Sequence, residues 1–347
     1  MAALRVGVVG LGVMGSHHAR VVRELDGVEL AGVVETAPER AASIDAPVYR
    51  SVAELIEAGV DAAVVAVPTT LHESTALELA DAGVHALVEK PIAADLDEAR
   101  RMADAFRRNG LVGAVGHIER FNPALQNLRS RVEAGELGSV YQIATRRQGP
   151  FPIRIADVGV IKDLATHDID LTSWLAQSPF RAVHANTSRR SGRPHEDMVA
   201  FNGRLDDGII TNHLVNWLSP MKERITVVTG ERGAFVADTL SGDLTYYENG
   251  TDATEWDAVS NFRGVAEGSV IRFALKKREP LRIEHEAFRD AILHGRPGIV
   301  TMDEGLTTLA VAEAVMRSAD EQREVEIDPE TLPSALAGRL AGNGTTR

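Results

Sequence analysis

The chain contains 347 residues, which exceeds the length of one typical domain and predicts two. Apolar residues make up 44% and charged residues 25% of it, as in ordinary globular proteins, and no apolar run is long enough to span a membrane. The net charge of −13 argues against sequence-independent binding to nucleic acid, and the absence of cysteine excludes disulfides, thiolate metal sites and cysteine nucleophiles.

Buried strands alternate with helices in the first third of the chain. The opening residues run into a glycine-rich turn without the charged start or cleavage site of a signal peptide, so we expect a cytoplasmic protein. The pattern predicts strands at residues 5–9, 29–35, 62–67, 85–88 and 111–116, and helices at 16–25, 52–58, 72–82 and from Asp95 onward. This alternation is typical of a parallel, doubly wound sheet, and we expect a dinucleotide-binding Rossmann domain over residues 1–120.

The pattern changes after about residue 120 to long runs with alternating or β-branched residues. We expect strands at residues 140–146, 183–188, 198–205, 209–217, 224–229 and 234–238, and helices from near Asp163, at 284–293 and at 304–319. These elements predict a C-terminal α/β domain over residues 121–330, with a large, mostly antiparallel open sheet that serves substrate binding and oligomerisation. Residues 331–347 have little to bury, so we expect a frayed tail. Helices would cover only one face of such a sheet, which predicts a homodimer or homotetramer joined sheet to sheet.

The segment GLGVMG at residues 10–15 follows a predicted strand and opens a predicted helix. In that setting the first glycine permits a tight turn, the second lets the main chain approach a pyrophosphate, and the third allows close helix packing. The helix start supplies N–H groups to the phosphates. The residues of this segment expected to contact the cofactor are Gly10, Gly12, Val13, Met14 and Gly15.

Glu35 stands at the end of the second predicted strand, 20 residues after Gly15. A carboxylate at this distance binds the adenosine ribose hydroxyls and repels the ribose phosphate of NADP. The sequence therefore predicts NAD as the cofactor, and NADP stays possible because Arg40 lies close to this carboxylate.

The predicted strand at residues 85–88 runs into Glu89, Lys90 and Pro91. Side chains at the carboxyl ends of parallel strands reach the crevice in which ligands bind, and a lysine there can stabilise a developing alkoxide. The alternative interpretation is an ordinary strand end with a surface ion pair.

Asp163 and His167 are four residues apart on a predicted helix, so they share one face. Asp163 can orient the imidazole of His167 for general acid–base work on a hydroxyl, although a purely structural histidine is the alternative. Metal binding is a competing hypothesis because Asp168 and Asp170 lie nearby. Those two carboxylates cannot both share the face of Asp163 and His167, so we expect no metal.

Two groups of arginines are candidates for binding a small anionic ligand, with solvated surface arginines as the alternative. They are Arg146, Arg147 and Arg154, and then Arg189, Arg190 and Arg193. Arg154 precedes Asp163 by nine residues, so we expect it near the catalytic helix, where a guanidinium can bind a diphosphate in a bidentate manner.

The chain resembles the Gfo/Idh/MocA oxidoreductase family through the segments GLGVMG, AVPTTLH, EKP, GHIERFNPA, DLATHDID and TVVTGERGAFVAD, which occur in the family order. The resemblance implies catalytic roles for Lys90, Asp163 and His167. It implies cofactor contacts for Gly10, Gly12, Gly15, Glu35, Pro68, His72, Glu89 and Asn122. A sugar or nucleotide-sugar substrate would then bind to Lys90, Arg154, Asp163 and His167.

Within that family, the stretch that ends in DLATHDID is similar to the branch that oxidises the 3-hydroxyl of UDP-N-acetylglucosamine. Lys162 departs from that branch, in which an apolar residue is expected. The expected activity is hydride transfer from a secondary sugar hydroxyl to NAD. The alternatives are an inositol or free-sugar dehydrogenase, a redox-neutral enzyme that retains NAD for elimination or glycoside cleavage, and a cofactor-sensing regulator.

Overall fold

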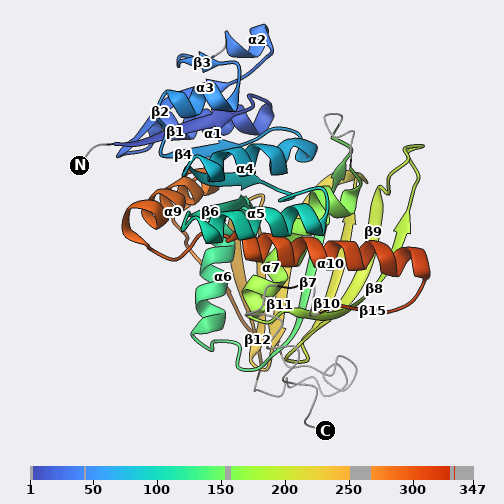
Figure 1. Ribbon diagram of the computed structural model, residues 1–347. Coiled ribbons are helices and arrows are strands. Elements are labelled where there is room, and N and C mark those ends of the chain that lie inside the picture. The colour runs from blue at the N-terminus through green and yellow to red at the C-terminus, as the bar shows by residue number, and fades with distance from the viewer. Residues whose placement is uncertain (1–2, 43, 153–157, 251–266, 329–331, 333–347) are drawn as a thin grey trace, which may run out of the picture. The chain divides into compact units, whose positions relative to one another are not determined.

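The computed structural model describes residues 3–42, 44–152, 158–250, 267–328 and 332 (Figure 1). The chain divides into two compact units, one combining Met1–Ile118 with Glu279–Ala310 and the other combining Glu119–Arg278 with Val311–Pro329. The first unit thus includes a segment from late in the chain. The sequence predicted a first domain of residues 1–120 alone, without this segment. Arg154 and the expected frayed tail, except Leu332, lie outside the described residues.

The first unit contains a six-stranded parallel sheet in the order β3-β2-β1-β4-β5-β6, so the expected doubly wound Rossmann sheet is confirmed. Its strands are β1 (Leu4–Val9), β2 (Val28–Val34), β3 (Val48–Tyr49), β4 (Ala62–Val65), β5 (His85–Glu89) and β6 (Gly113–Gly116). Its helices are α1 (Val13–Glu24), α2 (Pro38–Ala41), α3 (Val52–Glu57), η1 (Thr69–Leu71), α4 (His72–Asp81), α5 (Leu96–Arg108), α9 (Pro280–His294) and the first part of α10 (Met302–Glu321).

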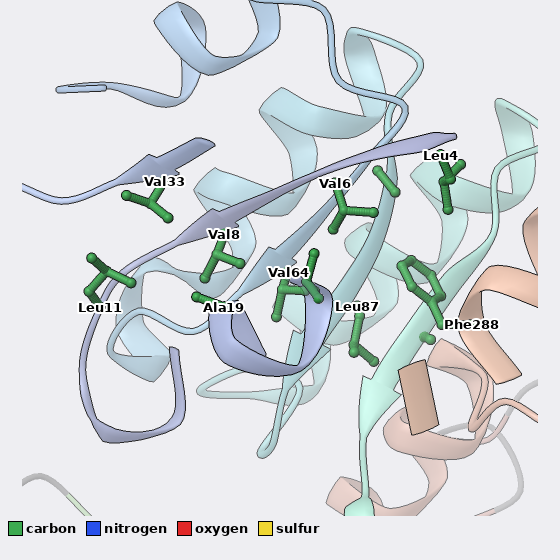
Figure 2. Close-up of a cluster of buried hydrophobic side chains, with 12 residues drawn as sticks. Leu4, Val6, Val8, Leu11, Ala19, Val33, Val64, Leu87 and Phe288 are labelled. Carbon is green, nitrogen blue, oxygen red and sulfur yellow. The ribbon is translucent and has the colours of Figure 1, made fainter. Parts of the chain in front are cut away.

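The core of this unit explains why the strands are apolar almost throughout. Helices pack on both faces of a parallel sheet. Successive strand side chains point to opposite faces, so both sets are buried. The main cluster consists of Leu4, Val6, Val8, Leu11, Ala19, Val22, Val33, Ala62, Val64, Leu87, Ala114 and Phe288 (Figure 2). Phe288 belongs to α9, so a helix from late in the chain packs into the core that the first strands form.

The second unit contains a nine-stranded sheet in the order β14-β13-β12-β11-β7-β10-β9-β8-β15, and all its pairs are antiparallel except that of β7 with β10. The expected large, mostly antiparallel sheet is therefore confirmed. Its strands are β7 (Val140–Pro150), β8 (Phe180–Ser188), β9 (Met198–Leu205), β10 (Ile210–Asn216), β11 (Leu218–Gly230), β12 (Gly233–Asp238), β13 (Asp243–Asn249), β14 (Glu267–Arg272) and β15 (Val325–Glu326).

Helical segments of the second unit lie against the inner face of this sheet, which is the face of Ile143, Phe201 and Phe235. These segments are η2 (Ile118–Phe121), α6 (Pro123–Glu133), η3 (Ile161–Ala165), α7 (Thr166–Ala176) and the last part of α10. Helix α6 packs against β12 and β13, and α7 packs against β7 (Figure 1). The sequence analysis did not predict α6, although Asn122 followed by Pro123 is a typical helix start.

The outer face of the nine-stranded sheet, defined by the alternate residues, carries many apolar side chains that are partly or fully exposed. They include Ala144, Ile210, Leu214, Val227, Val236, Tyr247 and Val270. In the described part of the chain, no helix is long and apolar enough to cross a membrane.

Candidate active site

The glycine-rich loop joins β1 to α1, and its three glycines have different surroundings. Gly10 has a φ of +91°, and a Cβ atom there would lie 2.8 Å from the carbonyl oxygen of Ala66. A Cβ atom on Gly15 would lie 1.8 Å from the carbonyl oxygen of Gly10. At Gly12 no atom lies within 4 Å of the Cβ position. The outer glycines are therefore required by the fold, whereas Gly12 leaves the space that a pyrophosphate needs.

Helix α1 begins directly after this loop, with Gly12 as its N-cap and no side-chain cap or acidic residue in its first turn. Val13 is exposed and Met14 is half-buried, so the helix start faces open space. N–H groups at such a helix start bind phosphate oxygens. The loop and the helix start together fit a dinucleotide.

Glu35 follows β2 and turns back toward the glycine-rich loop. Its carboxylate accepts hydrogen bonds from the N–H groups of Leu11 (2.9 Å), Thr36 (2.8 Å) and Ala37 (2.8 Å). Burial disfavours the charge, but the bonds from Ala37 and Leu11 outweigh it and lower the pKa of Glu35. The Arg40 Nε atom lies 3.3 Å from the same carboxylate. A ribose hydroxyl that binds Glu35 therefore competes with Arg40 for this oxygen.

Glu89 and Lys90 stand at the carboxyl end of β5. The Glu89 carboxylate accepts a hydrogen bond from the Lys90 main-chain N–H (3.1 Å), and its other oxygen lies 2.9 Å from His18 Nε2. A Cβ atom on Gly116 would lie 3.2 Å from the Glu89 carboxyl carbon, so this glycine of β6 makes room for the carboxylate. Glu89 is buried and Lys90 half-buried. The lysine is thus anchored through its main chain.

His72 begins α4 and is buried between main-chain carbonyl groups. Its Nδ1 atom lies 3.0 Å from the Pro91 oxygen, and its Nε2 atom lies 3.0 Å from the Val67 oxygen. Burial lowers the pKa of His72, so the neutral ring donates its single hydrogen to one of these carbonyls. His72 therefore connects the segment after Lys90 to the turn that contains Pro68, which is itself exposed.

Asp163 and His167 lie on successive turns of one helical segment, and both are buried. The sequence predicted an α-helix from near Asp163, but Asp163 belongs to the π-helical η3, which leads directly into α7. Such wide turns occur often at functional sites. Glu196 anchors the start of η3, because its side chain accepts from the Ile161 N–H (3.0 Å) and its carbonyl accepts from the Val160 N–H (3.0 Å).

Two buried ion pairs hold α7 in place. Arg147 of β7 donates to Asp168 (2.9 Å) and to Glu119 (2.8 Å), and Arg120 donates twice to Asp170 (2.7 and 2.6 Å). Burial opposes the charge of Arg147, but Asp168 and Glu119 raise its pKa. Both carboxylates are thus engaged by arginines, and the described residues contain no cluster of three side chains suited to a metal ion.

Most described arginines of the two predicted clusters have side-chain contacts within the protein. Arg189 Nε donates to the Pro194 carbonyl (3.3 Å), whereas Arg190 has an exposed side chain and is held through its main-chain N–H, which donates to Asp197 (2.7 Å). Arg146 pairs with Glu223 (3.4 Å), and Arg147 is buried in the ion pairs above. The Arg193 guanidinium lies over the rings of Phe151 (4.2 Å) and Trp217 (5.2 Å). The position of Arg147 on the inner face of an alternating strand indicates a buried pair, a signal that the sequence analysis did not use.

Asn122 is buried, and its side chain is engaged at both ends. Its oxygen accepts from the Ala124 N–H (3.0 Å), and its nitrogen donates to the Thr239 carbonyl (3.0 Å). This geometry makes Asn122 the N-cap of α6. A cofactor contact through the same side chain would use the second amide hydrogen or the second lone pair of the oxygen.

The first unit therefore brings the expected cofactor residues together at one edge of its sheet. Gly10, Glu35, Pro68 and Lys90 follow β1, β2, β4 and β5, and the carboxyl ends of parallel strands lie at the same edge. The second unit holds Asn122, Asp163 and His167. A ligand site at this edge, beside the point where the strand order reverses, defines a dinucleotide-binding protein.

The chain belongs to the Gfo/Idh/MocA oxidoreductase family. The family model for the NAD-binding Rossmann fold matches residues 4–117, and the model for the C-terminal alpha/beta domain matches residues 129–327. The resemblance noted in the sequence is confirmed, and the cofactor domain is of the NAD-binding kind.

Two relatives and two solved structures illustrate the range within this family. The UDP-N-acetylglucosamine 3-dehydrogenase of Acidithiobacillus ferrooxidans is 33% identical over 90% of this chain and 96% of its own. Its structure superimposes with a TM-score of 0.81 over 92% of this chain and 99% of that one, at 30% identity. Inositol 2-dehydrogenase 2 of Saccharopolyspora erythraea is 28% identical over 94% of this chain and 97% of its own. GenD2 from gentamicin A biosynthesis, solved with NAD, has a TM-score of 0.78 and 28% identity over 94% of this chain and 97% of that one.

Proposed function

We propose that this protein is a dehydrogenase that oxidises a secondary hydroxyl of a sugar, and that its substrate is a nucleotide sugar such as UDP-N-acetylglucosamine, oxidised at the 3-hydroxyl. The observation that carries the proposal is that Asp163 and His167 are both buried and lie on successive turns of one helical segment, in η3 and at the start of α7. The relative of 33% identity, which matches 90% of the chain, supports the substrate class.

Each catalytic side chain has one role in this proposal. His167 takes the proton of the substrate hydroxyl, and Asp163 orients the imidazole. Lys90 stabilises the negative charge that develops on the same oxygen. NAD, when bound, supplies the acceptor for the hydride that leaves the carbinol carbon. Gly12 and the start of α1 would hold its pyrophosphate, and Glu35 its adenosine ribose.

We propose that NAD is preferred over NADP, because the Glu35 carboxylate repels a ribose phosphate. Arg40 moderates this preference through its ion pair with Glu35. Inositol stays the second substrate candidate, since an inositol dehydrogenase is 28% identical over 94% of the chain.

The experiment is a substrate screen with the purified protein. Nucleotide sugars, free sugars and inositols are offered with NAD or with NADP, and formation of reduced cofactor is followed by its absorbance. We expect the largest kcat/KM for a UDP-amino sugar with NAD, and His167→Ala and Lys90→Ala should each lower turnover by about 10²- to 10⁴-fold. Exposed His17 offers a control, since His17→Ala should leave turnover unchanged.

Two outcomes would contradict the proposal. Unchanged turnover in both the His167 and the Lys90 variants would remove the catalytic assignment. Conversion of a sugar without any net cofactor reduction would instead indicate a redox-neutral enzyme that retains its cofactor.

We further propose that the protein forms a homodimer or homotetramer through the outer face of the nine-stranded sheet. Ile210, Tyr247 and Val270 on this face are 50%, 47% and 62% exposed. Val227 and Val236 pair with each other on neighbouring strands of the same face. Exposed apolar surface of this extent is typical of a protein–protein contact.

A further inference from the structure

Four ionisable side chains are buried near one another in the first unit. The proposed mechanism assigns a step to none of them. His18 comes from α1, Glu89 from the end of β5, and Glu284 and His285 from α9. Their relative exposures are 0%, 9%, 2% and 3%. Burying ionisable side chains is unfavourable unless they are paired. The contacts that these four make therefore have to offset the cost of their burial.

The contacts form a chain that ends at the residue before Lys90. His285 Nε2 lies 2.8 Å from His18 Nδ1, and His18 Nε2 lies 2.9 Å from a Glu89 carboxylate oxygen. An ionised carboxylate only accepts, so His18 donates from Nε2. One hydrogen then joins His18 Nδ1 to His285 Nε2. The other Glu89 oxygen accepts from the Lys90 N–H at 3.1 Å.

The groups around Glu89 favour its ionised form, so Glu89 carries the negative charge of this cluster. They are His18 from α1, Lys90 beside it, His72 from α4, and Glu284 and His285 from α9. Burial opposes the charge of Glu89, but the hydrogen bond from His18 and the charge of Lys90 lower its pKa. Burial and the charge of Glu89 raise the pKa of Glu284 well above its usual value, which favours the neutral acid.

His285 stays neutral in this arrangement. Burial, and then the neighbouring His18, lower the pKa of His285 well below its usual value. A neutral ring can donate or accept at Nε2, so His285 satisfies the contact with His18 with the hydrogen on either side.

We propose that His18 and His285 are positioning residues, which hold the Glu89 carboxylate against the main chain of Lys90 and keep its negative charge beside the Lys90 ammonium. The two histidines act through Glu89 and touch neither substrate nor the reacting atoms. A helix from late in the chain thereby takes part in organising the lysine at the end of β5. This inference rests on the proposed catalytic role of Lys90.

The variants are chosen to separate the hydrogen bond from the space that His18 fills. His18→Gln can place an amide donor where Nε2 lies, whereas His18→Leu keeps a similar volume without a donor. Glu89→Gln removes the charge at constant shape. His17→Leu is the matched control, because His17 neighbours His18 on α1 but is exposed.

The first measurement needs no substrate. The rate at which a lysine-selective succinimidyl ester acylates Lys90 is determined at fixed pH by peptide mass spectrometry. The hydrogen bond from the Lys90 N–H to the Glu89 carboxylate restrains the main chain at residue 90. His18→Leu and Glu89→Gln weaken this restraint, so both variants should label about 5-fold faster or more. Wild type, His17→Leu and His18→Gln should label alike. Equal labelling of wild type and Glu89→Gln, with unfolding temperatures unchanged, would overturn the inference even if His18→Leu does not fold.

The second measurement uses the sugar that the screen identifies. His18→Leu and Glu89→Gln should lower kcat about 10-fold with little change in KM for the sugar, and His18→Gln should recover most of it. If the wild type oxidises no sugar but the labelling difference persists, the proposed function fails and the positioning role stands. If sugar is oxidised but labelling and kcat do not respond to these variants, the positioning role fails alone.

Discussion

At the scale of single residues, the three glycines of the loop after β1 are required for different reasons. Gly15 has no room for a side chain, because the carbonyl oxygen of Gly10 occupies the place of its Cβ atom. Gly12 has room for one, because nothing lies within 4 Å of its Cβ position. A substitution at Gly15 therefore acts on the fold, and a substitution at Gly12 acts on the ligand.

Two alanine variants test this distinction. Gly15→Ala should lower the free energy of unfolding by about 3 kcal/mol, since the main chain must move to accept the methyl group. Gly12→Ala should leave stability within about 0.5 kcal/mol of wild type but weaken NAD binding at least about 10-fold. Urea unfolding and a titration with NAD measure the two effects. Equal NAD affinity in Gly12→Ala and wild type would show that the pyrophosphate does not approach this glycine.

Arg154 tests the nucleotide half of the proposed substrate. A bidentate guanidinium–phosphate contact is worth about 1.5–3 kcal/mol, so Arg154→Ala should raise KM for a nucleotide sugar about 10- to 100-fold with a smaller loss in kcat. Arg154→Lys should restore only part of the affinity, because an ammonium lacks the planar fork. Arg146→Ala is the control, since Arg146 is exposed and pairs with Glu223. A fall in stability without any change in KM would assign Arg154 to the loop instead.

At the scale of elements, α9 and the start of α10 complete the first unit although they come from late in the chain. Phe288 of α9 joins the core of the Rossmann sheet. The Val115 N–H of β6 donates to the Val300 carbonyl (2.8 Å), and Gly305 packs against Val115. The segment at residues 279–310 thus takes part in the stability of the dinucleotide-binding unit.

Glu284 of α9 makes this stability dependent on pH. Its folded-state pKa is raised well above the usual 4.5, so between these two pKa values the folded protein keeps a proton that the unfolded chain has released. Stability is therefore full below the unfolded pKa and falls as pH rises, by up to about 1.4 kcal/mol per pH unit. Glu284→Gln lacks this loss, so its free energy of unfolding should rise relative to that of wild type as the pH increases from about 5 to about 8.

Urea unfolding at both ends of this range measures the difference. Glu286→Gln serves as the control, because Glu286 lies on the same helix and forms an ion pair with Arg282 (3.5 Å). A stability difference between Glu284→Gln and wild type that stays constant with pH would exclude a buried, protonated Glu284.

At the scale of the whole molecule, the outer face of the nine-stranded sheet is the surface on which the oligomer is proposed. Val236→Lys places a charge in the middle of this face, where Val236 pairs with Val227. We expect this variant to lower the oligomer mass to that of a monomer in light scattering, while circular dichroism stays unchanged. Leu293→Lys, at an exposed apolar residue of α9, should not change the mass. A wild-type protein that is already monomeric at micromolar concentration would contradict the proposal.

Much of the first unit could be predicted from local sequence. A parallel sheet buried on both faces requires continuous apolar strands, which is why β1, β4 and β5 were visible. The glycine spacing and Glu35 indicated the NAD-binding loop because that loop is formed by adjacent residues. The sequence placed Asp163 and His167 on one helical face because they are four residues apart. The π-helical turn was not predicted, and its start is hydrogen-bonded to Glu196, a residue 35 positions from Ile161.

Contacts between distant segments were decided by the tertiary structure alone. Local patterns could not show that Asp168 and Asp170 bind buried arginines. A helix was predicted at residues 284–293, within the observed α9 (Pro280–His294), but its place against α1 was not predicted. The contacts of His18 with Glu89 and His285 depend on the packing of α9 against α1. The sequence by itself determined the strands, the helices and the loops that carry local chemistry, because these depend on neighbouring residues. Which buried charges neutralise one another depends on packing between segments as much as 267 residues apart.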